Sequence, residues 1–464
     1  MRKFARTISG VTPVAVMARP MACPGNCVYC PDYSETPRSY TPESPAVLRA
    51  IRCGYDAREQ VSFRLRIFAE MGHPIDKVEL IIMGGTFLAQ SVEYQYEFIQ
   101  GCYEGLNGAD APNLAEARKI NESTANRCVG LCIETRPDWC GEAEVPRMLE
   151  FGATRVEMGV QTLDDGIYQL VKRGHGVDAV RQATKLLKDQ AFKVYYHWMP
   201  GLPGLTPEGD ITLFNKLFSD PDFRPDGLKI YPTVVVEGSE LDKWRKDGRY
   251  TPYDEPTMLK LIGDMKERVP PYVRIPRVLR DIPARYIMAG CRDSLRDTVK
   301  NRMREKGIAC QCIRCREYGH RLRAGYVPGE PELKRLDYEA SGGLEIFLSY
   351  EDAQNTLFGL LRLRIQAVPP PLGWPIDGRA GMVRELHVFG PEVPISARLD
   401  AATQHRGLGK ALLAEAERIT REEFGIACIA VLAGTGSREY YRGEPGYTIK
   451  GEYMVKELPV GVKA

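Results

Sequence analysis

Three cysteines near the amino terminus constrain this chain more tightly than any other feature. Cys23, Cys27 and Cys30 follow the spacing Cys-x3-Cys-x2-Cys, and Tyr29 stands directly before the third thiol. Three thiolates can hold three irons of a cubane [4Fe-4S] cluster and leave the fourth iron open. An open iron can chelate S-adenosylmethionine, and an electron from the cluster then releases a 5′-deoxyadenosyl radical. The spacing therefore predicts radical chemistry.

A zinc loop and a set of unligated core cysteines are the two alternatives for this motif. Zinc normally takes a fourth ligand close by, and this stretch offers none. Unligated thiols do not account for the regular spacing. The chain has 13 cysteines, an odd number, mostly clustered or scattered singly. This usage indicates a reducing cytoplasm with metal sites and not a disulfide scaffold.

The first half of the chain alternates between strand and helix patterns. With 464 residues, two or three domains are expected. Helical patterns separate six predicted strands, and a parallel sheet curled into a partial barrel follows. The strands are predicted at 14–18, 77–83, 128–135, 154–160, 194–199 and 228–231, and the helices at 44–71, 92–106, 164–173, 177–190 and 207–218. The cysteines follow the first strand, at the edge where such barrels carry their chemistry.

Other strand ends supply candidate partners for the same site. Gly84 and Gly85 close the second strand and would let the backbone approach a bound amino group. Glu134, Gln161 and His197 end or follow later strands and are candidate contacts for the adenosine or methionine part. The alternative for these three side chains is a structural hydrogen bond at the rim of the barrel.

Positive charge is concentrated in one segment. The net charge is only +2, yet residues 272–324 contain 14 lysines and arginines against 5 acidic residues. This density of positive charge can neutralise the phosphate backbone of a nucleic acid. The alternative is that the segment forms an ordinary solvent-exposed surface.

A second thiol cluster, Cys310, Cys312 and Cys315, ends the basic segment. With Cys291 or His320 as the fourth ligand, these thiolates fit a tetrahedral structural zinc. Unligated thiols and a second iron–sulfur cluster are the alternatives. Tyr318 lies beside the cluster and would either stack on an RNA base or pack internally.

The pattern changes after residue 343. Three strands of an antiparallel sheet are predicted at 344–350, 356–365 and 382–389, and a Pro- and Gly-rich loop fills 367–379. A loop with the pattern Gln404-x-x-Gly407-x-Gly409 then precedes an amphipathic helix at 411–424 and a strand at 426–432. Backbone N–H groups at such a helix start can bind a pyrophosphate. This order resembles the GNAT-type acetyltransferase fold, which binds acetyl-CoA; a glycine turn before an ordinary helix is the alternative.

Longer strings carry a resemblance over nearly the whole chain. They include Met83-Gly84-Gly85-Thr86-Phe87, Ile133-Glu134-Thr135-Arg136-Pro137-Asp138, Phe223-Arg224-Pro225-Asp226-Gly227-Leu228-Lys229, Leu348-Ser349-Tyr350-Glu351-Asp352, Arg384-Glu385-Leu386-His387-Val388 and Tyr440-Tyr441-Arg442. In these strings the chain resembles the catalytic subunit of the Elongator family of tRNA wobble-uridine modifying enzymes, in a stand-alone bacterial or archaeal form.

The resemblance implies an α/β chain of three parts. These are a partial (β/α)6 radical S-adenosylmethionine barrel at 1–271, a basic linker with a zinc-binding cysteine cluster at 272–341, and a GNAT-type domain at 342–464. The implied acetyl-CoA contacts are Lys77, Glu385, Leu386, His387, Val388, Leu408, Gly409, Lys410 and Tyr441. Because Lys77 belongs to the first part, the coenzyme would lie between domains. Tyr441 would orient the thioester or assist proton transfer, or simply pack under the coenzyme.

The implied activity is the formation of 5-carboxymethyluridine at the wobble position of tRNA. The radical would take a hydrogen from the methyl group of acetyl-CoA, and the resulting carbon would add to C5 of uridine before thioester hydrolysis. The implied partners are the tRNA anticodon stem-loop, an electron donor and, as a possible assembly, a homodimer. A protein lysine acetyltransferase with a structural cluster and a non-catalytic RNA-binding scaffold are the rival functions.

A cytoplasmic location without membrane contact is expected. No apolar run reaches about 18 residues, the length that a membrane span requires. The basic start of the chain has no apolar stretch behind it, so no signal peptide is predicted.

Overall fold

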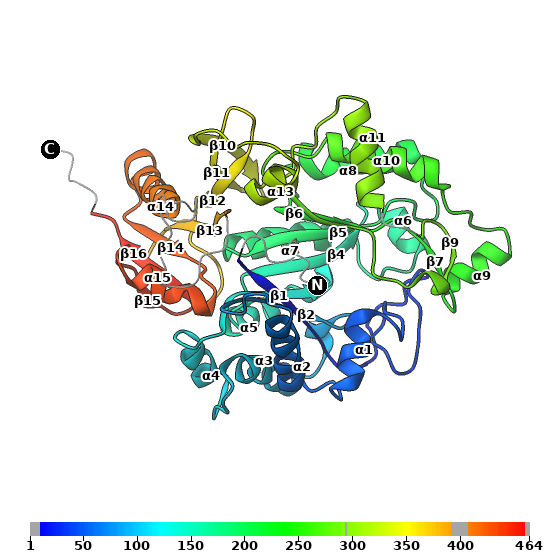
Figure 1. Ribbon diagram of the computed structural model, residues 1–464, viewed down its shortest axis with the longest axis horizontal. Helices are drawn as coiled ribbons and strands as arrows, with labels where there is room; N and C mark the ends of the chain where they lie inside the picture. Colours follow the sequence, from blue (N-terminus) through cyan, green and yellow to red (C-terminus); the bar gives the residue numbers. More distant parts are fainter. Residues whose placement is uncertain (1–9, 293–294, 391–406, 460–464) are drawn as a thin grey trace.

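The amino-terminal half builds one parallel sheet, as the alternating pattern predicts. The computed structural model describes residues 10–292, 295–390 and 407–459. Seven parallel strands pair in the order β1-β2-β3-β4-β5-β6-β8 at the centre of the molecule (Figure 1). They are β1 (Thr12–Met17), β2 (Lys77–Met83), β3 (Arg127–Thr135), β4 (Arg155–Gln161), β5 (Lys193–Trp198), β6 (Gly227–Ile230) and β8 (Arg274–Val278).

Helices connect these strands and bury their apolar sides against the sheet. They are α1 (Pro45–Arg52), α2 (Ala57–Glu70), α3 (Val92–Asn107), α4 (Leu114–Asn121), α5 (Glu144–Glu150), α6 (Asp165–Leu170), α7 (Val177–Asp189), α8 (Pro207–Ser219), α9 (Glu240–Lys246) and α10 (Glu255–Glu267). The prediction of one helix at 44–71 is wrong. Gly54 and Tyr55 have φ values of 58° and 59°, in the left-handed region, which ends α1. Asp56 then caps α2 by accepting a hydrogen bond from the backbone N–H of Glu59.

The sheet has one strand more than the sequence predicts. β8 comes from the basic segment and pairs with β6. Its sequence is Arg-Ile-Pro-Arg-Val, in which only Ile275 and Val278 are buried. Two arginines and a proline hide the strand pattern, which is tolerable because β8 lies at the edge of the sheet. After β8 the segment continues with β9 (Ile287–Ala289), which pairs with the earlier strand β7 (Val235–Val236). Three helices follow: α11 (Leu295–Glu305), α12 (Ile313–Arg316) and α13 (Tyr318–Arg323).

The carboxyl-terminal part forms a second sheet of seven strands. Its order is β10-β11-β12-β13-β14-β16-β15, with β10 (Glu332–Ala340), β11 (Gly343–Glu351), β12 (Leu357–Gln366), β13 (Gly381–Val388), β14 (Cys428–Val431), β16 (Tyr453–Glu457) and β15 (Thr448–Lys450). The predicted antiparallel pairing of the strands at 344–350, 356–365 and 382–389 is confirmed, whereas β13 and β14 run parallel. Sequence patterns did not reveal β10, which carries many exposed charged residues, or the short strands β15 and β16.

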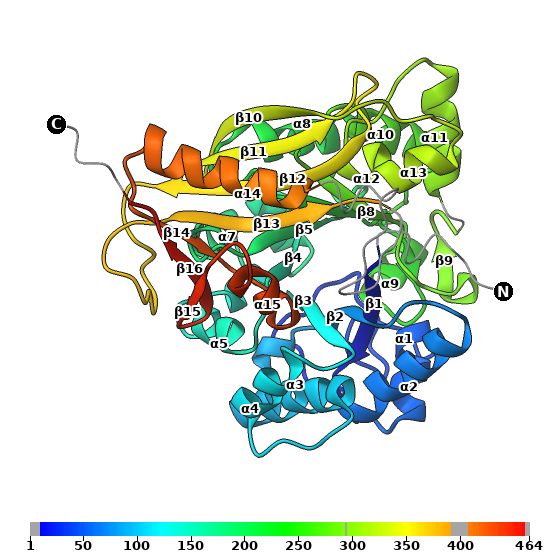
Figure 2. The same ribbon diagram turned by 60° about the vertical axis from the view of Figure 1, so that its left-hand side comes forward.

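One long helix covers the outer face of this second sheet. It is α14 (Leu408–Arg418), which lies across β11, β12 and β13 (Figure 2). The helix begins three residues earlier than predicted because Gly407, at φ 74°, starts it, and a wider turn at Ile419–Glu423 continues it. Residues 404–406 of the predicted glycine loop lie outside the described ranges.

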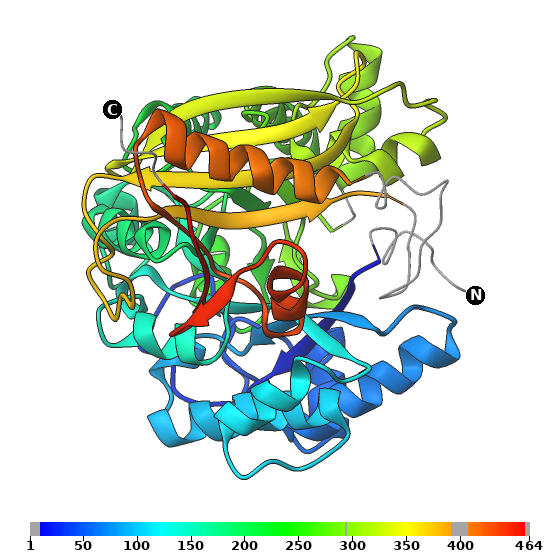
Figure 3. The ribbon, with the colours of Figure 1, turned by 90° about the vertical axis from the view of Figure 1, so that its left-hand side faces the viewer.

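The two sheets pack directly against each other. A turn at Thr435–Ser437 lies on the start of β3, just before α15 (Arg438–Arg442), so that the second sheet and the β1–β3 region meet there (Figure 3). A Cβ atom added to Gly434 would lie 2.3 Å from the carbonyl oxygen of Val129. None of the helices in the described ranges combines the length and apolar character needed to cross a bilayer.

Candidate functional site

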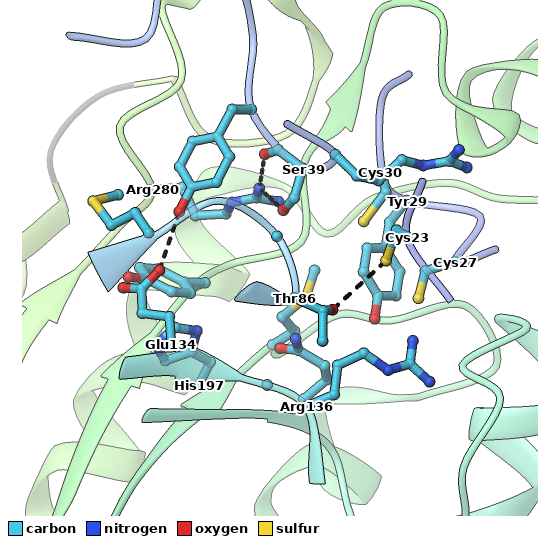
Figure 4. Close-up of a pocket in the computed structure, with 18 of the residues that line it drawn as sticks. Cys23, Cys27, Tyr29, Cys30, Ser39, Thr86, Glu134, Arg136, His197 and Arg280 are labelled. Atoms are coloured by element: carbon cyan, nitrogen blue, oxygen red, sulfur yellow. Dashed lines mark hydrogen bonds between the residues drawn. The ribbon is translucent and has the colours of Figure 1, made fainter. Parts of the chain in front are cut away.

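The predicted cluster thiols lie together at the carboxyl edge of the first sheet. Cys23, Cys27 and Cys30 follow β1 and line one side of a cavity of about 150 Å³ (Figure 4). The backbone N–H of Val28 donates to the carbonyl of Val171 over 3.1 Å, and the Val28 side chain is fully buried. The loop is therefore anchored between its ligands while the thiols face the cavity.

The two predicted glycines serve different ends at this edge. Gly84, at φ 135°, leaves no room for a side chain, because a Cβ there would lie 2.9 Å from the Cβ of Ala18. Gly85, at φ 74°, lines the cavity beside Arg38. Gly84 thus closes the packing of β2 on β1, and Gly85 brings backbone to the cavity wall.

The opposite wall of the cavity carries the other predicted polar residues. Glu134, Gln161 and His197 all line the cavity, as do Tyr231 and Arg136. Figure 4 shows Glu134 and His197 across the cavity from the three thiols. The placement of these residues at strand ends therefore brings them to one site, as the barrel topology predicts.

Behind this wall, the barrel interior is charged. The Lys229 ammonium lies 2.8 Å from Glu134 Oε1 and also pairs with Glu157, whose Oε2 is 3.2 Å from His197 Nε2. The Tyr40 hydroxyl donates to Glu134 over 3.1 Å. Burial alone would raise the pKa of Glu134, but Lys229 outweighs it and holds that pKa below the ordinary value. Barrel interiors usually hold branched apolar side chains, so this cluster marks a functional region.

The residues around the thiols fit an iron–sulfur cluster with a polar ligand. A hydrogen bond from Cys30, together with the nearby Arg173 guanidinium, lowers the pKa of Cys27 to about 4, against the effect of burial. Thiolates are the form that binds iron. Arg136 Nη1 and Gln161 Oε1 are buried and have no hydrogen-bond partner among the described residues. Both residues line the cavity and can pair with carboxylate and amino or hydroxyl groups of a small molecule.

The second thiol cluster also comes together. The ligand atoms of Cys310, Cys312 and Cys315 lie within 4.8 Å of one another. Hydrogen bonds from the other two thiols lower the pKa of Cys315 to about 2, and the Lys266 ammonium lies 3.8 Å from its sulfur. Three close thiolates beside a cation suit a tetrahedral metal with one further ligand.

The predicted fourth ligands do not join this group. Neither Cys291 nor His320 has a ligand atom within 4.8 Å of all three sulfurs, and His320 instead approaches Glu317 at 4.0 Å. Tyr318 packs against Phe358, with ring centroids 5.3 Å apart, so its internal role is the one observed. His320 lies on helix α13, which starts three residues after Cys315.

The strand that carries four of the predicted coenzyme contacts separates from its neighbour. β13 pairs with β14 only from Gly381, opposite Ile429, to Val383, opposite Val431. Beyond Val383 the strand keeps its pairing with β12, up to Val388 opposite Gly359, but not its pairing with β14. In the described ranges, the edge of β13 that faces β14 therefore has no pairing with β14 at Glu385, Leu386 and His387.

The other predicted contacts gather near the start of α14, and its first turn contains Leu408, Gly409 and Lys410. Lys410 pairs with Glu444. The Tyr441 side chain is buried, with its ring 5.1 Å from that of Tyr440 and 5.8 Å from that of Tyr447. Tyr441 therefore has a packing role whether or not it also contacts a ligand.

Lys77 and Glu385 lie far from the thiol loop. Lys77 is the first residue of β2, and the cavity is at the other end of that strand, roughly 20 Å away at about 3.3 Å per residue. Glu385 is held by Arg362 at 2.8 Å and by Lys193, the first residue of β5, at 3.4 Å. The two predicted cofactor sites therefore approach opposite edges of the first sheet.

Three residues of the site were not identified from the sequence. Tyr40 and Arg173 lie in irregular segments, and no local pattern marks them. Lys229 could have been identified, because a lysine within the buried strand Gly227–Ile230 requires an acidic or hydrogen-bonding partner.

Comparisons with known proteins agree with this architecture. Residues 20–215 match the Radical SAM superfamily, and residues 225–305 match the Radical_SAM C-terminal domain. The chain is 61% identical to the tRNA uridine(34) acetyltransferase of Dehalococcoides mccartyi, over 99% of this chain and 100% of that protein. It is 44% identical to human Elongator complex protein 3, over 98% and 85% of the two chains. The archaeal Methanocaldococcus infernus Elp3 with N-terminus deletion (1-46) superposes with a TM-score of 0.86 at 44% identity, over 97% of this chain and 100% of that one.

Proposed function

Because the chain belongs to the family of tRNA uridine(34) acetyltransferase and Elongator complex protein 3, we propose that it modifies the wobble uridine of tRNA. The observation that carries this proposal is that Cys23, Cys27 and Cys30 together line a polar cavity at the carboxyl edge of the sheet. The proposed product is 5-carboxymethyluridine, with acetyl-CoA as the source of the added carbons.

Cys23, Cys27 and Cys30 would hold the [4Fe-4S] cluster. With S-adenosylmethionine bound, this group supplies a carbon-centred radical, the chemistry that activates a methyl group for bonding to C5 of uridine. Arg136 and Gln161 would pair with the polar ends of the small molecule, since both offer unpartnered buried atoms there. The chain itself contributes position and exclusion of water.

The second sheet would be the GNAT-type domain that binds acetyl-CoA. Two features support this assignment: the separated strands at residues 384–388 and the glycine-led start of α14. Leu408, Gly409 and Lys410 would present backbone N–H groups to the pyrophosphate. Since Glu385 and the thiols lie at opposite edges of the first sheet, the acetyl group must reach the cavity past the charged interior around Glu157.

The Cys310, Cys312 and Cys315 cluster would hold a structural zinc with a fourth ligand other than Cys291 or His320. It lies beside the basic helix α11. This helix turns Val299 and Met303 inward and exposes Lys300, Arg302 and Arg304. We propose this exposed face as part of the surface that holds the tRNA backbone.

The direct test uses reconstituted protein with tRNA, acetyl-CoA, S-adenosylmethionine and dithionite. The Cys27→Ala variant should lose carboxymethyluridine, measured by mass spectrometry of nucleosides, whereas Cys53→Ala, a partly exposed cysteine at the end of α1, should retain it. Equal product from both variants would refute the proposal. Acetylation of a lysine peptide without reductant would favour a protein acetyltransferase.

The tRNA surface is tested through salt dependence. The logarithm of the binding constant should fall steeply with the logarithm of salt concentration, by about 0.7–0.9 for each phosphate contacted. The triple substitution of Lys300, Arg302 and Arg304 to glutamine should flatten this slope. A slope that is already flat in the unaltered protein would remove the RNA assignment.

A further inference from the structure

The turn between α6 and α7 clamps the thiol loop through one arginine. Arg173 is buried, and its Nη1 donates to the sulfur of Cys27 over 3.3 Å. Its Nη2 donates to the carbonyl of Gly159 on β4. The guanidinium therefore bridges a cluster ligand and the wall of the barrel.

The surrounding backbone fixes this arginine in place. Its own N–H donates to the carbonyl of Tyr168, and its carbonyl accepts from Arg136 Nη2, each over 2.8 Å. Gly159 makes the room, because a Cβ there would lie 2.7 Å from Arg173 Nη2. Two neighbours, Lys172 and Gly174, have φ values of 55° and 85°, a tight turn held by these contacts.

The charge of Arg173 is balanced by sulfur. Arginine keeps its charge in proteins, and a buried charge requires a partner. Within the described ranges this guanidinium forms no ion pair with a carboxylate, and the side-chain atom to which it donates is the Cys27 sulfur. An arginine with no acidic partner, aimed at a metal ligand, points to a role in tuning the metal.

We propose that Arg173 sets the reduction potential of the cluster through its hydrogen bond to Cys27. This inference rests on the proposed cluster but needs neither tRNA nor acetyl-CoA. Taking one electron from a low-potential donor adds one negative charge to the cluster. Hydrogen bonds to the ligand sulfurs and nearby positive charge stabilise the reduced state and raise the potential. Loss of Arg173 should therefore make reduction harder.

The experiment is a dithionite titration of the reconstituted protein followed by electron paramagnetic resonance, with iron and sulfide measured in parallel. The Arg173→Gln variant should show a midpoint potential more negative than that of the unaltered protein. Arg173→Lys should show a smaller shift in the same direction, since one ammonium keeps the charge but cannot serve both Cys27 and Gly159. Arg277→Gln is the matched control, because Arg277 lines the same cavity but pairs with Asp281.

An unchanged potential in Arg173→Gln with full iron content would overturn the proposal, and so would an equal shift in Arg277→Gln. If Arg173→Gln does not assemble a cluster, Arg173→Lys decides: a negative shift supports the assignment and the original potential refutes it. Absence of iron from the reconstituted unaltered protein would instead refute the proposed function.

Discussion

Replacing Arg384 by methionine should loosen the junction between the two sheets. Arg384 is fully buried on β13 and forms a two-pronged ion pair with Asp226, just before β6, at 2.6 and 2.8 Å. It also contacts Glu345 on β11 at 2.9 Å and the carbonyl of Phe192 at 2.6 Å. One side chain thus joins two carboxylates and a backbone group from both domains.

The expected loss follows from the charges that remain. Methionine preserves packing but leaves Asp226 and Glu345 with less compensation; Lys188 stays 3.8 and 3.9 Å from them, and Arg364 keeps its contact with Glu345 at 2.9 Å. Breaking a buried ion pair from one side costs ~3–5 kcal/mol. A loss of ~4 kcal/mol corresponds to roughly a thousandfold change in the unfolding equilibrium.

The assay is differential scanning calorimetry of the variant with the cofactor content held equal. Arg335→Met is the matched control, because Arg335, on β10 of the same sheet, donates from Nη1 to Glu423 and from Nε and Nη2 to Asp337, in pairs that are about one-third exposed. Such exposed pairs contribute ~0–1 kcal/mol. Since a chain of several domains can unfold in steps, we expect Arg384→Met to lower or split the transition of the second sheet.

The same prediction has a pH signature. Burial would raise the pKa of Asp226, but Arg384, with Lys188 and Arg362, outweighs it and holds that pKa below the ordinary value of 3.8. A depressed carboxyl pKa stabilises the fold above about pH 4 and loses this effect in acid. The deficit of Arg384→Met should therefore shrink as pH falls below 4. A deficit as small as that of Arg335→Met at neutral pH would refute the reasoning.

Three further predictions concern other parts of the chain. Burial raises the pKa of Asp210 from 3.8 to about 7, so the native state binds more protons than the unfolded state between these values and stability falls as pH rises. The Tm of Asp210→Asn minus the Tm of the unaltered protein should therefore be larger at pH 8 than at pH 4.5. The same difference at both pH values would contradict this prediction. Gly434→Ala should lower the free energy of unfolding by ~1–3 kcal/mol, because its Cβ would collide with the backbone of Val129. Gly263→Ala, which has open space around it, should leave that free energy unchanged, and calorimetry can compare the two variants. Cys312→Ser should remove zinc but not iron in elemental analysis; a parallel loss of iron would indicate a second iron–sulfur cluster.

The sequence by itself predicted which cysteines are grouped into two candidate metal sites, because their spacing is short. The spacing of Cys23, Cys27 and Cys30 within eight residues predicts one metal site, and the structure places all three on the lining of one cavity. The same holds for Cys310, Cys312 and Cys315, whose sulfurs the structure brings together. The parallel sheet was also predictable, because alternating buried strands and amphipathic helices have few other ways to bury their apolar faces.

Only the tertiary structure decided which distant side chains complete these sites. Arg173 reaches Cys27 across 146 positions of sequence, and Arg384 reaches Asp226 across 158. The string around Arg384 resembles a coenzyme-binding segment, yet its first residue joins two domains. Likewise, Cys291 and His320 are near the second thiol cluster in sequence, yet neither has a ligand atom within 4.8 Å of all three sulfurs. Local patterns record which face of an element is apolar; which charge meets which depends on how whole elements dock, and that information is spread over the entire chain.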